Sequence, residues 1–304
     1  WDQRVAGSNP AAPTIMKKFK ISLIKIIILI GSKTVLGRGY SRKLLIILVE
    51  KILNSINYDI SKPLFKTDFH GFKIYFYADN QTELKLYFQR NENKELNFLK
   101  KNIKNNSWFI DIGSYIGLYT LNVANLNSKK KLIKTLSIEP NPLSFNRLKK
   151  NLNLLKIRNK YIKNRTFLVN TAIGNKKGYG YINTKINHAS VKVLNKKSVQ
   201  QKIQKRIKIN KIKSLIKKYK IKNIYCIKID TEGYEKIILK NFFNDISNEY
   251  YPKFLIVEHN NDPNFNYIDK LLLNKGYEMT FTTNSNAIYR IKNEKSWERI
   301  LRGF

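Results

Sequence analysis

The stretch from Phe109 to Thr120, FIDIGSYIGLYT, decides the fold. It begins within a short apolar strand, Trp108–Ile112, and continues into a helix. Gly113 permits a sharp turn at positive φ or the close approach of a ligand, and Gly117 permits close packing where the helix begins. Asp111, at the end of the strand, can accept a charge-assisted hydrogen bond from a cationic ligand. The loop predicts a nucleotide-like ligand, although two glycines also fit a plain strand-turn-helix corner.

Strands and helices continue to alternate toward the end of the chain. Strands are expected at Leu136–Ile138, Phe167–Val169, Ile224–Ile229 and Phe254–Val257, with a closing strand pair at Tyr277–Thr282 and Ala287–Ile291. Helices are expected at Gly117–Leu126, Pro142–Leu155, Ile212–Tyr219, Gly233–Asn241 and Tyr267–Leu273. The rest of the Lys-rich piece from Asn195 to Lys222 is interpreted as a solvated face. This alternation predicts an α/β fold with a parallel sheet and helices on both faces.

Three segments are expected along the chain: 1–15, 16–94 and 95–304. Residues 1–15 lack the Lys/Ile/Asn composition of the rest, and their Gly-Ser-Asn-Pro fits a transfer RNA gene read in frame. We therefore expect them to be a non-native upstream segment, with Met16 as the start. The last segment, from Glu95 onward, holds the alternating strands and helices.

The middle segment, residues 16–94, predicts a helical and hairpin extension. The apolar run Ile21–Ile30 is too short to span a membrane, so we expect an amphipathic helix, buried in the protein or lying on a membrane surface. A second apolar run, Leu44–Leu53, is its expected partner. Aromatic alternation over Phe65–Phe88 predicts a strand hairpin, with Ala78–Asn80 near its turn.

The charge balance is strongly basic, with 58 Lys+Arg against 21 Asp+Glu and a net charge of +37. Such a charge suits an anionic partner, either nucleic acid, a membrane surface or an acidic glycan. The lysines are spread over nearly every segment, which favours nucleotide bias as their origin.

Cys226 is the only cysteine, so no intrachain disulfide can form. We expect Cys226 to be buried. We expect the protein to be cytoplasmic, or to lie at the inner face of the membrane.

A second acidic residue, Glu139, ends the next strand and is followed by Pro140 and Asn141. A carboxylate at this strand tip can accept hydrogen bonds from two ribose hydroxyls. It is equally the acid that a helix start favours through the helix dipole. The combination differs from a dinucleotide motif, because Asp111 replaces the first glycine, and from a P-loop, because no Gly-Lys-Ser/Thr follows.

Five segments together resemble the FkbM-type methyltransferase family, within the class I S-adenosylmethionine-dependent fold. They are FIDIGSYIGLYT, SIEPNPLSFNRLKKNL, VNTAIGNKKGYGYI, KIDTEGYEKIILKN and FLIVEHN, between about Glu95 and Tyr289. The resemblance implies a Rossmann-like, seven-stranded, mostly parallel sheet with an antiparallel last strand, and S-adenosylmethionine as cofactor. It implies cofactor contacts from Asp111, Gly113, Tyr115, Gly117 and Glu139. Ser114-Tyr115 departs from the usual Ala-Asn, which puts the hold on the methionine end of the cofactor in question.

The KIDTEG motif places two acids, Asp230 and Glu232, at the end of a strand that faces the transferring methyl group in such enzymes. Methyl transfer needs alignment, and a sugar hydroxyl also needs a base or a metal ion. We expect Asp230, Glu232 and His188 to be catalytic; His259 is more simply a satisfied histidine. A cluster of Asp230, Glu232 and Glu258 is a candidate Mg²⁺ site, while the alternative pairs Lys228 with one of these acids and leaves the rest to cap a helix.

The function expected from the resemblance is O-methylation of a sugar or other small-molecule hydroxyl, with a small molecule or glycan as the acceptor. An RNA methyltransferase that uses the basic surface is the first alternative. A non-catalytic, membrane-associated protein with the same fold is the second, and the oligomeric state is left open.

Overall fold

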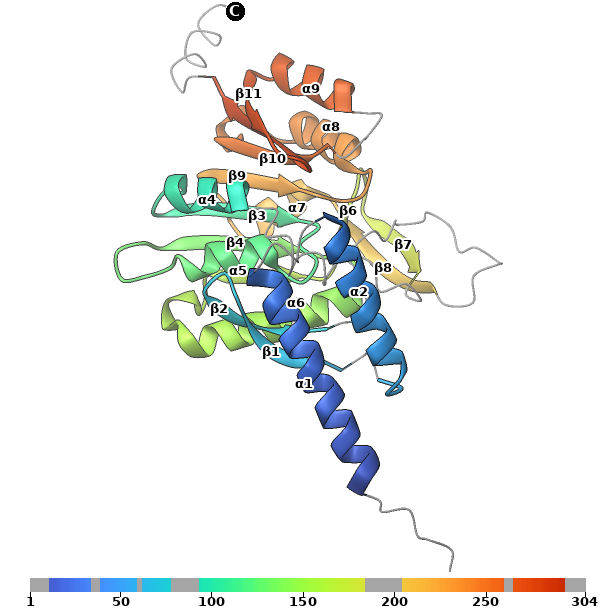
Figure 1. The fold of residues 1–304 in the computed structure, drawn as a ribbon. Coiled ribbons are helices and arrows are strands. Elements are labelled where there is room, and N and C mark those ends of the chain that lie inside the picture. The colour runs from blue at the N-terminus through green and yellow to red at the C-terminus, as the bar shows by residue number, and fades with distance from the viewer. Residues whose placement is uncertain are drawn as a thin grey trace, which may run out of the picture. The chain divides into compact units, whose positions relative to one another are not determined.

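Seven strands in the C-terminal two thirds of the chain form one sheet, in the order β11-β12-β10-β9-β3-β4-β5 (Figure 1). β12 runs antiparallel to both β10 and β11, and the other pairings are parallel. The strands are β3 Ser107–Ile112, β4 Ile133–Ile138, β5 Thr166–Val169, β9 Ile224–Ile229, β10 Phe254–Glu258, β11 Tyr277–Thr282 and β12 Asn286–Ile291. The predicted mostly parallel sheet with an antiparallel last strand is confirmed.

The computed structural model describes residues 11–33, 39–58, 62–77, 93–183, 204–259 and 265–292. The chain divides into two units, residues 1–91 and 92–304, and the large sheet belongs to the second. The helices of the second unit are α4 Asn93–Asn102, α5 Leu118–Asn125, α6 Pro142–Arg158, α7 Ile212–Lys218, α8 Glu235–Asp245 and α9 Phe265–Asn274, with short 3₁₀ turns at Lys160–Ile162 and Asn248–Tyr250. Within the described residues, no helix is both long and apolar enough to cross a membrane.

The central strand β3 is buried on both faces and divides the core of this unit. Trp108, Ile110 and Ile112 pack with side chains of α7, α8 and α9 on one face, while Phe109 packs with α4 and α5 on the other. Because side chains alternate along a strand, Asp111 belongs to the face of Phe109 and α5. Cys226 is fully buried, as predicted.

A second sheet of three strands follows β5, in the order β6-β8-β7. Its strands are β6 Ala172–Ile173, β7 Gly178–Asn183 and β8 Gln204–Asn210. The expectation of a solvated face around 204–210 was therefore wrong in part. β8 alternates Ile207, which is buried, with lysine and arginine that point to solvent, so its one buried face was masked in the sequence by the surrounding lysines.

The described part of the N-terminal unit contains helices α1 Ala11–Lys33 and α2 Gly39–Asn54 and the hairpin of β1 Phe65–Phe69 and β2 Phe72–Phe76. The hairpin turns at His70-Gly71, where both residues have positive φ, at 47° and 86°. Such a two-residue turn matches the twist of the flanking strands. This turn precedes the one expected near Ala78–Asn80, which lies outside the described residues.

Candidate active site

The loop after β3 holds a left-handed conformation at every second residue. Gly113, Tyr115 and Gly117 have φ values of 82°, 49° and 97°. The backbone N–H groups of Gly113 and Ser114 both donate to the carbonyl of Ile138, at 2.9 and 3.1 Å, which ties the loop to the end of β4. The loop is therefore fixed by backbone bonds at the carboxyl edge of the sheet, where an open parallel sheet binds its ligands.

The two glycines of this loop are required by different neighbours. A Cβ atom on Gly113 would lie 1.7 Å from the backbone oxygen of Asp230, at the end of the adjacent strand β9. A Cβ atom on Gly117 would lie 2.3 Å from Cδ1 of Leu148 in α6. Gly113 thus lets the ends of β3 and β9 approach, and Gly117 lets α5 pack on α6, as the sequence predicted for the second glycine.

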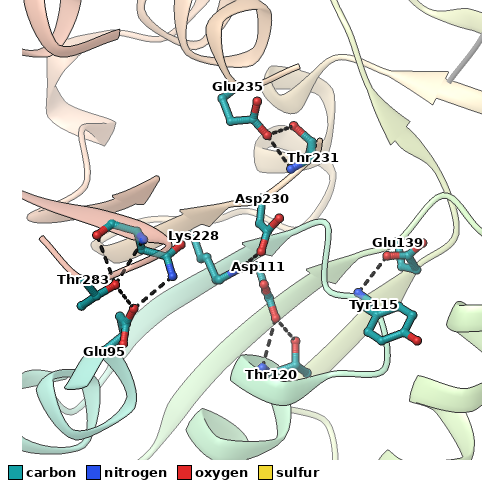
Figure 2. A network of polar contacts seen from close by, with 11 residues as sticks. Glu95, Asp111, Tyr115, Thr120, Glu139, Lys228, Asp230, Thr231, Glu235 and Thr283 are labelled. Atoms are coloured by element: carbon teal, nitrogen blue, oxygen red, sulfur yellow. Dashed lines mark hydrogen bonds and ion pairs between the residues drawn. The ribbon is translucent and has the colours of Figure 1, made fainter. Parts of the chain in front are cut away.

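Asp111 is 1% exposed and holds the first turn of α5. Its Oδ2 accepts hydrogen bonds from the backbone N–H of Thr120 at 3.0 Å and from the hydroxyl of Thr120 at 2.6 Å (Figure 2). Its Oδ1 is buried and has no hydrogen-bond partner among the described residues. Burial raises the pKa of Asp111, while Lys228 acts in the opposite direction. One carboxylate oxygen therefore remains available to a donor from a ligand.

Glu139 links the loops that follow β3 and β4. Its Oε2 accepts from the backbone N–H of Tyr115 at 2.8 Å (Figure 2). Its Oε1 accepts from the backbone N–H of Asn141, also at 2.8 Å. Asn141 caps α6 through a bond from Leu143. Burial raises the pKa of Glu139 to about 7. Each carboxylate oxygen can accept a further hydrogen bond, so Glu139 can both fix the loops and receive ligand hydroxyls.

Lys228 is the buried cation of this edge. It is 3% exposed and lies directly opposite Asp111 in the parallel pairing of β3 with β9. Its Nζ forms an ion pair with Oδ2 of Asp230 at 2.6 Å (Figure 2). The same Nζ lies 4.5 Å from the ring centre of Tyr119. Lys228 thus neutralises charge between two carboxylates at the ends of neighbouring strands. This is the pairing of Lys228 with an acid that the sequence offered as the alternative to a metal site.

Three acids from the ends of β9 and β10 come together beside this pair. Carboxylate oxygens of Asp230, Glu232 and Glu258 lie within 4.8 Å of one another, and all three residues are half-buried. Burial, followed by the charges of Asp230 and Glu232, raises the pKa of Glu258 to about 9. A hydrogen bond joins the side chains of Glu258 and Asp230 and also raises the pKa of Glu258.

The turn that carries these acids is fixed by Glu235, which the sequence reasoning did not single out. Glu235 Oε1 accepts from the backbone N–H and the hydroxyl of Thr231 (Figure 2). Its Oε2 accepts from the backbone N–H of Gly233. Glu232 takes a left-handed φ of 57° in the same turn. Strained backbone of this kind persists where neighbouring bonds hold it, and it is frequent at functional sites. Thr231 and Glu235 are spaced one residue further apart than in a capping box, so the sequence carried no established signal for these bonds.

The histidines differ in what the structure says of them. His259, directly after β10, bonds through its ring Nε2 to the carbonyl of Thr283 at 2.9 Å, and its backbone N–H donates to the carbonyl of Ser285. It therefore has a structural partner, as the simpler interpretation held. His188 lies outside the described residues, so its catalytic role stays a prediction.

A buried acid on α4, Glu95, supports the turn beside His259. Its Oε1 accepts from the hydroxyl of Thr283 and from the side-chain amide of Asn286, at 2.5 and 3.0 Å (Figure 2). Helix α4 was not predicted, so this support was missed. Its amphipathic signal, apolar Leu96 and Leu99 spaced by three, was present in the sequence.

The residues fit a ligand that has a cationic group and hydroxyls. Besides Oδ1 of Asp111, the hydroxyl of Ser114 is buried without a hydrogen-bond partner among the described residues. Glu139 adds acceptors at the end of the next strand. An amino acid joined to a ribose, as in S-adenosylmethionine, offers an ammonium group and hydroxyls to this set. A cavity of about 550 Å³ lined by Lys104, Lys253 and Lys292 involves none of these residues.

Comparison with known proteins gives one family. The sequence profile described as methyltransferase FkbM domain matches residues 111–279. No curated protein matches the chain at a significant level.

Three solved structures of methyltransferases are among those that match the chain. Methyltransferase FkbM from Methylobacillus flagellatus is 18% identical, with a TM-score of 0.46, over 69% of this chain and 52% of that chain. The chain thus spans about half the length of that protein. An rRNA methylase from Streptococcus thermophilus is 10% identical, with a TM-score of 0.41, over 67% and 98%. An O-methyltransferase from Bacillus cereus, in complex with SAH, is 10% identical, with a TM-score of 0.41, over 66% and 81%.

Proposed function

Since the chain belongs to the FkbM methyltransferase family, we propose that it methylates a hydroxyl group of a sugar or another small molecule, with S-adenosylmethionine as the donor. The observation that carries this proposal is the pair of buried carboxylates, Asp111 and Glu139, at the ends of adjacent strands. Asp111 keeps one oxygen without a donor, and Glu139 has acceptor capacity left. When bound, the cofactor would supply an electrophilic methyl group.

The proposed division of roles follows from the position of each carboxylate. Asp111 and Ser114 are proposed to hold the methionine end, and Glu139 the ribose hydroxyls. The left-handed backbone of Gly113, Tyr115 and Gly117 shapes the loop that follows Asp111. Holding both partners in a fixed geometry accounts for much of the rate of such a transfer, because little covalent chemistry is asked of the protein.

The acceptor hydroxyl must lose a proton, and the acids at the ends of β9 and β10 are proposed to receive it. Lys228 and Glu258 both bond Asp230 and orient its carboxylate. Glu232 lies in the same cluster, and we propose Asp230 and Glu232 as the groups that take the proton. The comparisons give no support to the predicted Mg²⁺, and three neighbouring carboxylates alone do not establish a metal site.

Calorimetric titration with S-adenosylhomocysteine tests the cofactor half of the proposal. We expect binding by the native chain and a Kd weakened by about tenfold or more in Glu139→Gln, because the ribose hydroxyls lose a charged acceptor. Glu249→Gln, an exposed acid outside the site, is the matched control and should bind as the native chain does. A native chain that does not bind the compound would exclude the proposed activity.

Mass spectrometry of candidate acceptors tests the second half. Incubation of the chain with labelled donor and a panel of hydroxylated sugars should yield products heavier by one methyl group. Asp230→Asn should lower kcat by about a hundredfold and leave the Kd for S-adenosylhomocysteine within about threefold of native. Loss of both together would instead indicate a structural role for Asp230.

One face of the β7–β8 hairpin favours RNA as a second candidate acceptor. Tyr179 lies opposite Lys208, and Tyr181 lies opposite Arg206, so these four side chains share a face. The guanidinium of Arg206 stacks 3.7 Å from the ring centre of Tyr179. Basic and aromatic side chains together suit single-stranded RNA. This alternative would be favoured if the chain binds an oligoribonucleotide with an affinity that falls steeply as salt rises. The Arg206→Glu variant should then bind the same oligoribonucleotide more weakly than the native chain.

A further inference from the structure

Helix α1 has two apolar faces, and its own unit covers one of them. Ile24 and Ile28 are 0% and 1% exposed and pack in one cluster with Ile46 and Val49 of α2. On another side of α1, Phe19 is 65% exposed. Burial in the protein, one of the two expectations for this segment, therefore holds for one face of the helix, while another face is exposed.

The exposed apolar side chains of α1 form a stripe. Met16, Phe19, Leu23 and Ile26 are spaced by three, four and three residues, which places them on one side of a helix. They are 58%, 65%, 38% and 52% exposed. Apolar side chains of this size are usually buried in a protein core. A continuous exposed stripe of them therefore indicates an interaction surface.

Helix α2, which packs on α1, carries a similar set. Leu44, Ile47 and Leu48 follow helical spacing and are 51%, 46% and 44% exposed. Of the sixteen large hydrophobic side chains that are exposed in the described part of the chain, seven lie on α1 and three on α2. This concentration distinguishes the two helices from the scattered apolar residues that any surface carries.

Cations flank the exposed apolar side chains. Lys17, Lys18 and Lys25 on α1 and Lys43 and Lys51 on α2 are exposed. Neither acidic residue type occurs on α1, and Glu50 is the one acid of α2. Apolar side chains bordered by lysines match a surface with negative headgroups over an apolar interior. A second copy of the chain on the same stripe would instead bring like charges together.

We propose that the outward faces of α1 and α2 bind an anionic lipid surface, with both helices lying in the plane of the interface. Met16, Phe19, Leu23 and Ile26 enter the boundary between headgroups and acyl chains, together with the exposed leucines and isoleucine of α2. The flanking lysines contact the headgroups. This inference is independent of the methyl transfer proposed for the second unit.

Flotation of the full chain with lipid vesicles tests the inference. The native chain should float with vesicles of phosphatidylcholine and phosphatidylglycerol, and less with phosphatidylcholine alone. The double variant Leu23→Ser, Ile26→Ser should lower the partition coefficient by at least about tenfold, because two apolar side chains no longer enter the lipid. Ile157→Ser on α6, at a side chain 85% exposed, is the matched control and should float as native.

A charge variant tests the anionic part separately. Lys17→Glu, Lys18→Glu should abolish the preference for phosphatidylglycerol, whereas Lys129→Glu, Lys130→Glu, with the same change in net charge, should keep it. The inference is overturned if the native chain binds neither vesicle, or if the serine variant floats as native. Sedimentation of a native dimer that the serine variant converts to monomer would assign the stripe to a second copy and overturn it as well.

Discussion

Lys228 is a buried cation between two carboxylates, Asp111 and Asp230. Replacing Lys228 with methionine keeps the bulk of the side chain and removes the charge, which leaves two carboxylates without compensation at a mostly buried edge. We expect Lys228→Met to lower the free energy of unfolding by about 3 kcal/mol. Urea denaturation of the native and variant chains measures the change.

A surface ion pair supplies the comparison for that variant. Lys211 bonds Asp245 at 2.6 Å, with side chains 33% and 24% exposed. Because solvent screens such a pair, Lys211→Met should cost less than about 1 kcal/mol. Equal losses in the two variants would show that the burial of Lys228 has no special weight.

Tyr115 takes a left-handed φ of 49°, a conformation that asparagine adopts more readily than most residues. We therefore expect Tyr115→Asn to be more stable than Tyr115→Ala by about 0.5–1 kcal/mol, since both variants lose the ring and differ in their tolerance of positive φ. The same pair of substitutions at Tyr179, on strand β7, should favour alanine or neither residue. Thermal unfolding of the four variants decides this, and an alanine variant at 115 as stable as the asparagine one contradicts it.

At the scale of elements, substitution of the two loop glycines should lower stability for different reasons. Gly117→Ala meets the end of the Leu148 side chain, so this change should cost less stability in a Leu148→Ala background than in the native chain. Gly113→Ala meets the backbone oxygen of Asp230, which no side-chain truncation can remove. We expect a loss of at least about 2 kcal/mol for Gly113→Ala, by chemical denaturation, and no recovery in the Leu148→Ala background. Recovery of both variants in that background would contradict the assignment of their neighbours.

The local parts of this edge were predictable from the sequence, because a strand, a glycine turn and a helix form a pattern within a few residues. The pattern placed Asp111 and Glu139 at adjacent strand ends. The position of Lys228 opposite Asp111 was not predictable, because it depends on the register of two strands far apart in the chain. Strand β8 was missed because its outward lysines resembled a solvated segment, and Glu235 because its bonds within the turn depend on backbone geometry.

At the scale of the whole molecule, buried acids make stability depend on pH. Burial raises the pKa of Glu139 from 4.5 to about 7 and that of Glu258 from 4.5 to about 9. Between the unfolded and the native pKa of each residue, the native chain holds a proton that the unfolded chain releases. The free energy of unfolding therefore falls as pH rises through that range. We expect a fall of at least about 2.5 kcal/mol between about pH 5 and pH 9, the part that Glu139 alone contributes, by urea denaturation at each pH.

Variants locate the origin of that slope. Glu258→Gln cannot ionise, so its stability should fall less over the same range, and Glu139→Gln should flatten the part below about pH 7. Glu249→Gln at an exposed site should retain the native slope. A native chain whose stability rises with pH over this range would contradict the assigned protonation of both residues.

The position of β3 between β4 and β9 has a consequence for the time course of folding. β4 follows β3 closely in the chain, whereas the bond from Asn223 to Asn106 beside β9 joins residues 117 positions apart. Contacts between distant segments form slowly, and synthesis delivers the N-terminal strands first. Nascent chains thus acquire Asp111 and Glu139 before Lys228 and Asp230 exist, so the carboxylate of Asp111 lacks its cation until β9 pairs with β3.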